Sequence, residues 1–202
     1  YLDADGTVNS DASKIGALAV GIPGTVAGLF EVHQKFGSLP FEKLIEPAIQ
    51  LALNGVVVTE KQAQSLNDHT DDFKIANNRT ILLDKVWKKG DTIKYLKLAE
   101  TLKRIKANGR DEFYKGETAD ILVEQVQELG GIITKEDLAS YVAVWRDPIT
   151  FMYKGHKIIS MPPPSSGGIC LAQILKSIEP YNVEQYTHNS TKYIQVIVEA
   201  ER

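Results

Sequence analysis

The sequence is organised around the stretch Ser160-Met161-Pro162-Pro163-Pro164-Ser165-Ser166-Gly167-Gly168-Ile169. Three successive prolines fix φ near about −65° and supply no amide donor, so they exclude a helix interior or a central strand. They predict a short polyproline II segment. The residues before them, 157–160, have a strand-like pattern, and residues 169–178 have a helical one. The stretch therefore predicts a strand, a stiff corner and the start of a helix.

The four residues after the prolines are the candidate binding residues. Ser165 and Ser166 are good helix N-caps, and Gly167 and Gly168 let the backbone turn without a Cβ penalty. The free amides of a helix N-terminus can bind an anion, which makes these four residues candidates for substrate binding. The alternative is a well-capped corner with a structural role only. A nucleophile elbow is not indicated, because the pattern G-x-S-x-G is absent.

Composition and charge describe an ordinary globular chain. Of its 202 residues 43% are apolar and 24% charged, which is enough for a core of its own. The net charge of −3 gives no electrostatic footprint for nucleic acid and no polybasic membrane patch. Cys170 is the only cysteine, so an internal disulfide is excluded, and its apolar helical surroundings predict a buried thiol.

The hydrophobic periodicity predicts a helix-rich α+β fold. Its expected strands are a buried Ala17–Val20 and, near the C-terminal side, runs at 142–145, 149–153 and 156–160 with a turn at Lys154-Gly155. Residues 67–91 lack periodicity and predict a loop. Two domains are expected, a mainly helical lobe over 1–141 and a hairpin, proline corner and two helices over 142–202. Helices are predicted over about 25–36, 40–54, 59–66, 95–107, 117–129, 134–141, 169–178 and 190–202.

Chemistry-bearing clusters are hard to assemble from these residues. The four histidines have no partner at metal-ligand spacing, and the group Asp68, His69, Asp71 and Asp72 fits no standard site, which favours a solvated acidic loop. Neither a Walker loop nor a dinucleotide-binding glycine pattern occurs. No metal, no cofactor and no catalytic residue is predicted in this segment.

Four stretches in order carry a family resemblance. They are Val20-Gly21-Ile22-Pro23-Gly24-Thr25-Val26-Ala27-Gly28, Phe113-Tyr114-Lys115-Gly116, Gly130-Gly131-Ile132-Ile133-Thr134-Lys135-Glu136-Asp137-Leu138, and Met161-Pro162-Pro163-Pro164-Ser165-Ser166-Gly167-Gly168. Together they resemble the large subunit of the γ-glutamyltransferases, also called γ-glutamyltranspeptidases or glutathione hydrolases. The resemblance covers nearly the whole chain.

The resemblance implies an autoprocessed N-terminal-nucleophile hydrolase of glutathione metabolism. Such an enzyme transfers the γ-glutamyl group of glutathione to water or an amino acid through a threonine on the small subunit, whose α-amino group is the base. That threonine, and the arginine that holds the substrate carboxylate, have no matching position in this chain. The resemblance therefore implies a small-subunit partner, a periplasmic or extracellular location, an αββα core containing strands Phe151–Tyr153 and Lys157–Met161, and a fragment that is inactive alone.

Three alternatives remain open at the level of sequence. One is a related acylase, another is a poly-γ-glutamate depolymerase, and the third is a non-catalytic scaffold module. The chain begins at Tyr1 and reaches Arg202 within a helical pattern, so we expect a segment of a longer precursor.

Overall fold

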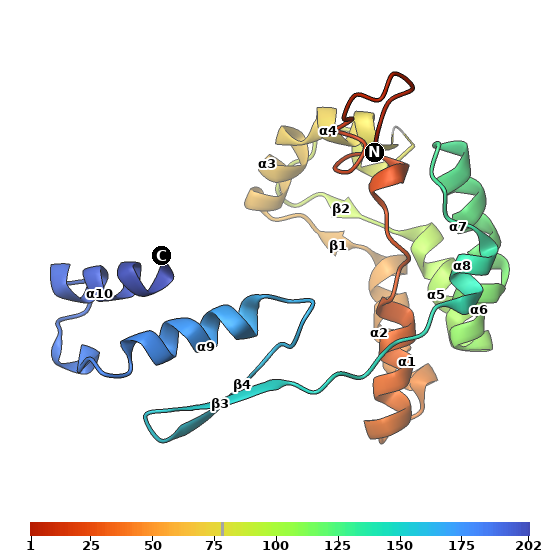
Figure 1. The fold of residues 1–202 in the computed structure, drawn as a ribbon. Coiled ribbons are helices and arrows are strands. Elements are labelled where there is room, and N and C mark those ends of the chain that lie inside the picture. Colours follow the sequence, from red (N-terminus) through yellow and green to blue (C-terminus); the bar gives the residue numbers. More distant parts are fainter. Residues whose placement is uncertain (78) are drawn as a thin grey trace. The chain divides into compact units, whose positions relative to one another are not determined.

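The computed structural model describes residues 1–77 and 79–202. The chain divides into two compact units, Tyr1–Ala143 (unit 1) and Val144–Arg202 (unit 2), each of which is described by itself (Figure 1). The fold class is helix-rich α+β, which confirms the expectation from the sequence. In the described ranges no helix is long and apolar enough to cross a membrane.

Unit 1 is mainly helical. The elements of unit 1 are η1 (Ala17–Ala19), α1 (Thr25–Phe36), α2 (Phe41–Asn54), β1 (Val56–Val57), α3 (Glu60–Asp68), α4 (Thr70–Asn77), η2 (Ile81–Leu83), β2 (Thr92–Ile93), α5 (Leu96–Asn108), α6 (Arg110–Lys115), α7 (Glu117–Glu128) and α8 (Lys135–Ser140). Strands β1 and β2 form a two-residue antiparallel pair, with Val56 opposite Ile93.

Local sequence sets the starts of α3 and α8 through capping boxes. Thr59 Oγ1 accepts the Gln62 amide at 3.3 Å while Gln62 Oε1 accepts the Thr59 amide at 2.9 Å. Thr134 and Asp137 make the same reciprocal pair at 3.2 and 2.9 Å. Both motifs satisfy amides that the helix itself leaves free, and both are legible from the sequence.

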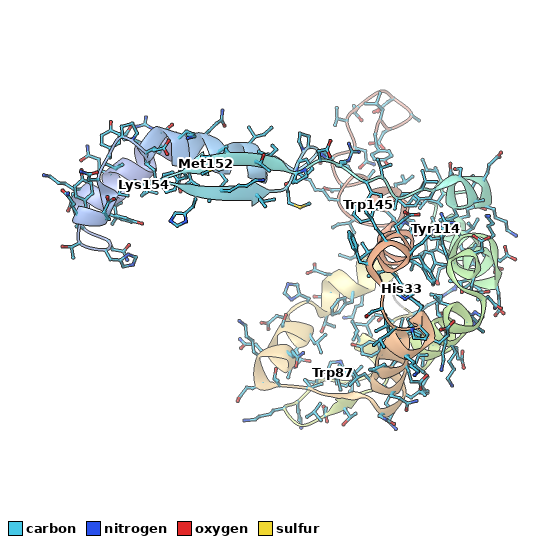
Figure 2. All side chains as sticks on the ribbon, turned by 90° about the horizontal axis from the view of Figure 1, so that it is seen from below. His33, Trp87, Tyr114, Trp145, Met152 and Lys154 are labelled. Carbon is cyan, nitrogen blue, oxygen red and sulfur yellow. The ribbon has the colours of Figure 1, made fainter. Side chains whose placement is uncertain are left out.

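The main core of unit 1 surrounds Tyr114, which is fully buried (Figure 2). Its hydroxyl donates to the Pro23 carbonyl at 2.7 Å and accepts the Ala27 amide at 3.0 Å, so a side chain from α6 caps the N-terminus of α1. The ring stacks on Tyr141 at 5.8 Å, with the Arg110 guanidinium 4.5 Å from its centroid. The buried members of this core are Ala27, Tyr114, Ala119, Val123, Ile133 and Leu138.

A second core of unit 1 forms around Trp87, whose indole N–H donates to the Leu82 carbonyl at 2.8 Å. Val58, Ala63 and Ile93 are buried with it. The Asn67 side chain pairs with the Trp87 backbone in both directions, each at 2.9 Å. This core therefore ties the segment before α5 to α3.

Unit 2 consists of a hairpin and two helices. Its elements are β3 (Ile149–Tyr153), β4 (His156–Ser160), α9 (Gly167–Ile178), η3 (Val183–Gln185) and α10 (Thr191–Glu201). Strand β3 pairs antiparallel with β4, from Ile149 opposite Ser160 to Tyr153 opposite His156. Lys154 and Gly155 have φ of 45° and 83°, as a two-residue hairpin turn requires.

The hairpin tip is held to the far end of α9 and to η3. The Lys154 amide donates to Glu179 Oε1 at 3.0 Å, and its ammonium donates to Glu184 Oε2 at 2.5 Å. The hydrogen bond to Glu184 raises the pKa of Lys154. Figure 2 labels Lys154 at this tip.

Three expectations from the sequence are wrong. The run Ala17–Val20 is a 3-10 turn rather than a strand, because it is alanine-rich and Gly16 turns into it at φ 91°. The run 142–145 has no strand partner among the described residues, and β3 begins only after Pro148. The loop expected over 67–91 contains α4 and η2; Asn78, which it also includes, lies outside the described residues.

Candidate functional site

The proline corner joins β4 to α9 as the sequence predicts, but its conformation differs from a polyproline II segment. The Ser165 amide donates to the Pro162 carbonyl at 3.2 Å, and the Pro163–Pro164 bond is cis. The three prolines therefore form a tight turn with a cis-proline at its third position. The prediction of a polyproline II segment was wrong because the restricted φ of proline favours an extended segment, whereas the hydrogen bond from Ser165 to Pro162 closes a turn that the sequence pattern did not indicate.

The capping of α9 is divided between the two serines. Ser166 is the N-cap by position, and its carbonyl accepts the Cys170 amide at 2.9 Å, but its side chain makes no capping hydrogen bond. Instead Ser165 Oγ accepts the Gly167 amide at 3.2 Å. The Ser165 hydroxyl is thus used in the turn, while Ser166 contributes its carbonyl to the first turn of α9.

Gly168 is the tightest position of the corner. It is buried, and a Cβ added there would overlap the carbonyl oxygen of Met161. The side of Gly167 is open by comparison, since the nearest atom to an added Cβ is Ser165 Oγ at 3.4 Å. The glycine pair therefore has one position fixed by close backbone approach and one that is not.

We expect Gly168→Ala to destabilise the corner by about 1–3 kcal/mol, because the backbone of Met161 must move. Hydrogen exchange of the α9 amides, measured by mass spectrometry, should become faster as a result of this loss of stability. Gly167→Ala is the matched control; it should leave exchange unchanged or slow it, since alanine favours a helix over glycine. Equal exchange rates in the two variants would contradict the packing described here.

A shallow groove of about 650 Å³ runs beside the corner within unit 2. Its walls are mainly apolar, with polar groups from Arg146, Ser160 and Ser165. Trp145 and Met161, half or more exposed, lie along it. The other lining residues are Val144, Pro148, Ile159, Pro162, Pro163 and Pro164.

The corner has no activated nucleophile among the described residues. Ser165 Oγ accepts a hydrogen bond from the Gly167 amide, and the described residues that line the groove beside it include no histidine, lysine or carboxylate that could take its proton. The histidines are scattered: His33 Nε2 and His69 Nδ1 lie 2.7 and 2.8 Å from the carbonyls of Leu39 and Ser65. Over the described ranges no group of three or more histidine, cysteine or acidic side chains could hold a metal ion.

Cys170 is exposed, so the prediction of a buried thiol is wrong. Helix α9 is apolar on more than one side but packs only part of its surface, and Gly168 and Ile178 are its buried residues. The thiol faces a groove of about 970 Å³ between α9 and α10. Helix α10 itself has no buried residue.

Sequence reasoning missed one buried ionisable group, Glu112 of α6. Its Oε1 accepts the Thr118 amide and hydroxyl at 3.1 and 2.9 Å and Arg104 Nε at 3.1 Å. Asn108 donates to Oε2 at 3.3 Å. Burial alone would raise the pKa of the Glu112 carboxyl, but these hydrogen bonds outweigh it and hold the pKa below its usual value. These contacts join Glu112 to Arg104 and Asn108 of α5 and to Thr118 of α7, so its carboxylate links three helices of unit 1.

Comparison with known proteins identifies a family that shares this sequence and fold. The sequence profile of the gamma-glutamyltranspeptidase family matches residues 1–202. The glutathione hydrolase proenzymes of Escherichia coli K12 and Pseudomonas aeruginosa are 41% and 43% identical over 100% of the chain. The crystal structure of Helicobacter pylori gamma-glutamyltranspeptidase superposes with a TM-score of 0.92 at 39% identity, covering 100% of this chain and 59% of that one.

The fold is thus that of a helix-rich α+β segment shared with these enzymes. The chain belongs to the gamma-glutamyltranspeptidase family, which confirms the resemblance inferred from the four motifs. It spans 36% of the length of the two curated relatives.

Proposed function

We propose that the protein to which these residues contribute is a γ-glutamyltransferase that also acts as a glutathione hydrolase. It takes the γ-glutamyl group of glutathione or a related compound and transfers it to water or to an amino acid. The observation that carries this proposal is the match to glutathione hydrolase proenzymes over the whole chain, at 41% and 43% identity.

The chemistry is supplied by residues outside this chain. A threonine freed at the N-terminus of a small subunit attacks the γ-carbonyl, its own α-amino group accepts the hydroxyl proton, and backbone amides stabilise the oxyanion. The described residues around Ser165 include no base that could activate its hydroxyl, which supports this division of labour. The 202 residues then act as a support for the small subunit of the same precursor.

We expect the complete precursor to yield two subunits on a denaturing gel and to release the free aniline from a γ-glutamyl anilide. The 202-residue chain alone should release none, because it lacks the nucleophile. Turnover by the isolated chain would contradict the proposal. Cleavage of a cephalosporin or glutaryl side chain by the precursor, without γ-glutamyl transfer, would favour the acylase alternative instead.

The proposed location of this enzyme is the periplasm or the extracellular space. Family resemblance supports it, and fractionation of cells that express the precursor tests it.

A further inference from the structure

Three helices of unit 1 each present one apolar stripe to a common groove of about 480 Å³. Helix α1 contributes positions with the spacing i, i+3, i+6, i+7 and i+10, and α2 contributes i, i+3, i+4 and i+7, the pattern of a helix face built for burial. Helix α5 closes one side. The groove is lined by Val26, Leu29, Val32, His33, Phe36, Gly37, Phe41, Leu44, Ile45, Ala48, Leu102 and Ile105.

The lining of this groove is almost free of polar groups. Among the described residues its lining contains no acidic, lysine or arginine side chain, and His33, the titratable residue of that lining, lies with Nε2 2.7 Å from the Leu39 carbonyl oxygen. Yet Leu29 is 55% exposed and Leu44 is 49% exposed. A face of this size and chemistry is costly to leave in water, and a charged occupant would lose its hydration there without a partner.

The side of α1 that faces away from the groove is already packed. Ala27 of α1 is fully buried in the core around Tyr114. Phe30 of α1 stacks on Phe41 of α2 at 4.1 Å, which fixes the angle between the two walls. A helix that is apolar on two sides, as α1 is, belongs in an interior, so its second face is suited to burial rather than to solvent.

We propose that this groove is the docking site of an apolar segment from the part of the same precursor outside these 202 residues. Most of the length of the curated relatives lies outside the matched part, since the chain covers 36% of it. A segment of the same polypeptide also has an effective concentration in roughly the millimolar range, which is higher than the concentration of most separate partner proteins. The inference rests on the proposed precursor.

The groove fits a helix. Helix α1 has 12 residues and is therefore about 18 Å long, which matches about three turns of a partner helix lying along it. The absence of charge in the lining means that leucine, isoleucine, valine or phenylalanine side chains of that helix would fill it.

The test is the reactivity of cysteines introduced into the groove. In a Cys170→Ser background, Leu29→Cys and Leu44→Cys are treated with a maleimide, and the labelled peptides are identified by mass spectrometry. Both cysteines should react readily in the 202-residue chain. In the complete precursor they should react at least about tenfold more slowly, because the site opens only by local unfolding.

The matched controls are Gln34→Cys on α1 and Lys43→Cys on α2, which are exposed and do not line the groove. They should react at similar rates in both proteins. Unprotected groove cysteines in the precursor would overturn the proposal. Protection of the groove cysteines in the 202-residue chain would also overturn the proposal. Protection that increases with protein concentration would indicate that a second copy of the chain fills the groove, and protection independent of concentration would indicate a small apolar molecule. Labelling needs no activity, so an inactive precursor with protected cysteines would refute the proposed function and leave the groove assignment intact.

Discussion

Glu112→Ala is expected to lower the free energy of unfolding of unit 1 by about 3–5 kcal/mol, because it removes the buried carboxylate that pairs with the partly buried Arg104. The Glu112 side chain is 6% exposed, and Arg104 is 24% exposed. Thr118, itself buried, loses the acceptor for both its amide and its hydroxyl. The loss is a large fraction of the stability of an ordinary domain, about 5–15 kcal/mol.

Urea unfolding of the 202-residue chain measures this effect. In a Trp145→Phe background the remaining indole, Trp87, is buried in unit 1 and reports its unfolding by fluorescence. Glu117→Ala is the matched control: Glu117 contacts the same arginine at 3.5 Å but is 65% exposed. Its removal should change the midpoint little, since exposed ion pairs contribute about 0–1 kcal/mol. A control as damaging as Glu112→Ala would show that loss of arginine pairing in general, and not burial, determines the result.

The same network predicts an acid dependence. The folded-state pKa of Glu112 lies below its usual value of 4.5, so its contribution to stability is complete above 4.5 and is lost as pH falls through the folded value. Glu112→Gln removes the titration while keeping most of the shape. The stability difference between the parent and Glu112→Gln should therefore shrink steadily below about pH 4.5. A difference that is constant with pH would mean that the carboxylate is not favoured by folding.

The sequence predicted well those features whose conformation is determined by residues close together in the chain. The hairpin turn at Lys154-Gly155 and the capping boxes at Thr59 and Thr134 depend on contacts a few residues apart, and the structure has all three. The four family motifs led to the right family for a related reason, because they are contiguous stretches.

What it predicted poorly depends on distant partners. The pair of β1 and β2 brings together Val56 and Ile93 with only two residues in each strand, too short for any periodicity. Helix α6 has six residues and is held by tertiary contacts of Glu112 and Tyr114. Cys170 was misplaced because an apolar pattern shows that a face is suited to burial without showing which neighbour covers it.

Tyr114 combines both kinds of information, because its aromatic character marks it as a packing residue while its hydroxyl partners are 87 and 91 residues away. Tyr114→Ala is expected to destabilise unit 1 by about 3–5 kcal/mol, through the lost ring and the cavity it leaves. Tyr114→Phe keeps the ring and should still cost about 1–3 kcal/mol, since the Ala27 amide and the Pro23 carbonyl lose their partner.

The pair Tyr114→Phe and Tyr141→Phe separates the hydroxyl from the stack. The two rings lie parallel within 6°, but the Tyr141 hydroxyl makes no hydrogen bond within the part of the chain that the structure describes. Burial also raises the pKa of Tyr114, which keeps its hydroxyl protonated and able to donate to Pro23. Tyr141→Phe should therefore leave the urea midpoint nearly unchanged while Tyr114→Phe lowers it. Equal effects would mean that the hydrogen bonds of the Tyr114 hydroxyl to Ala27 and Pro23 contribute no more to stability than the Tyr141 hydroxyl does.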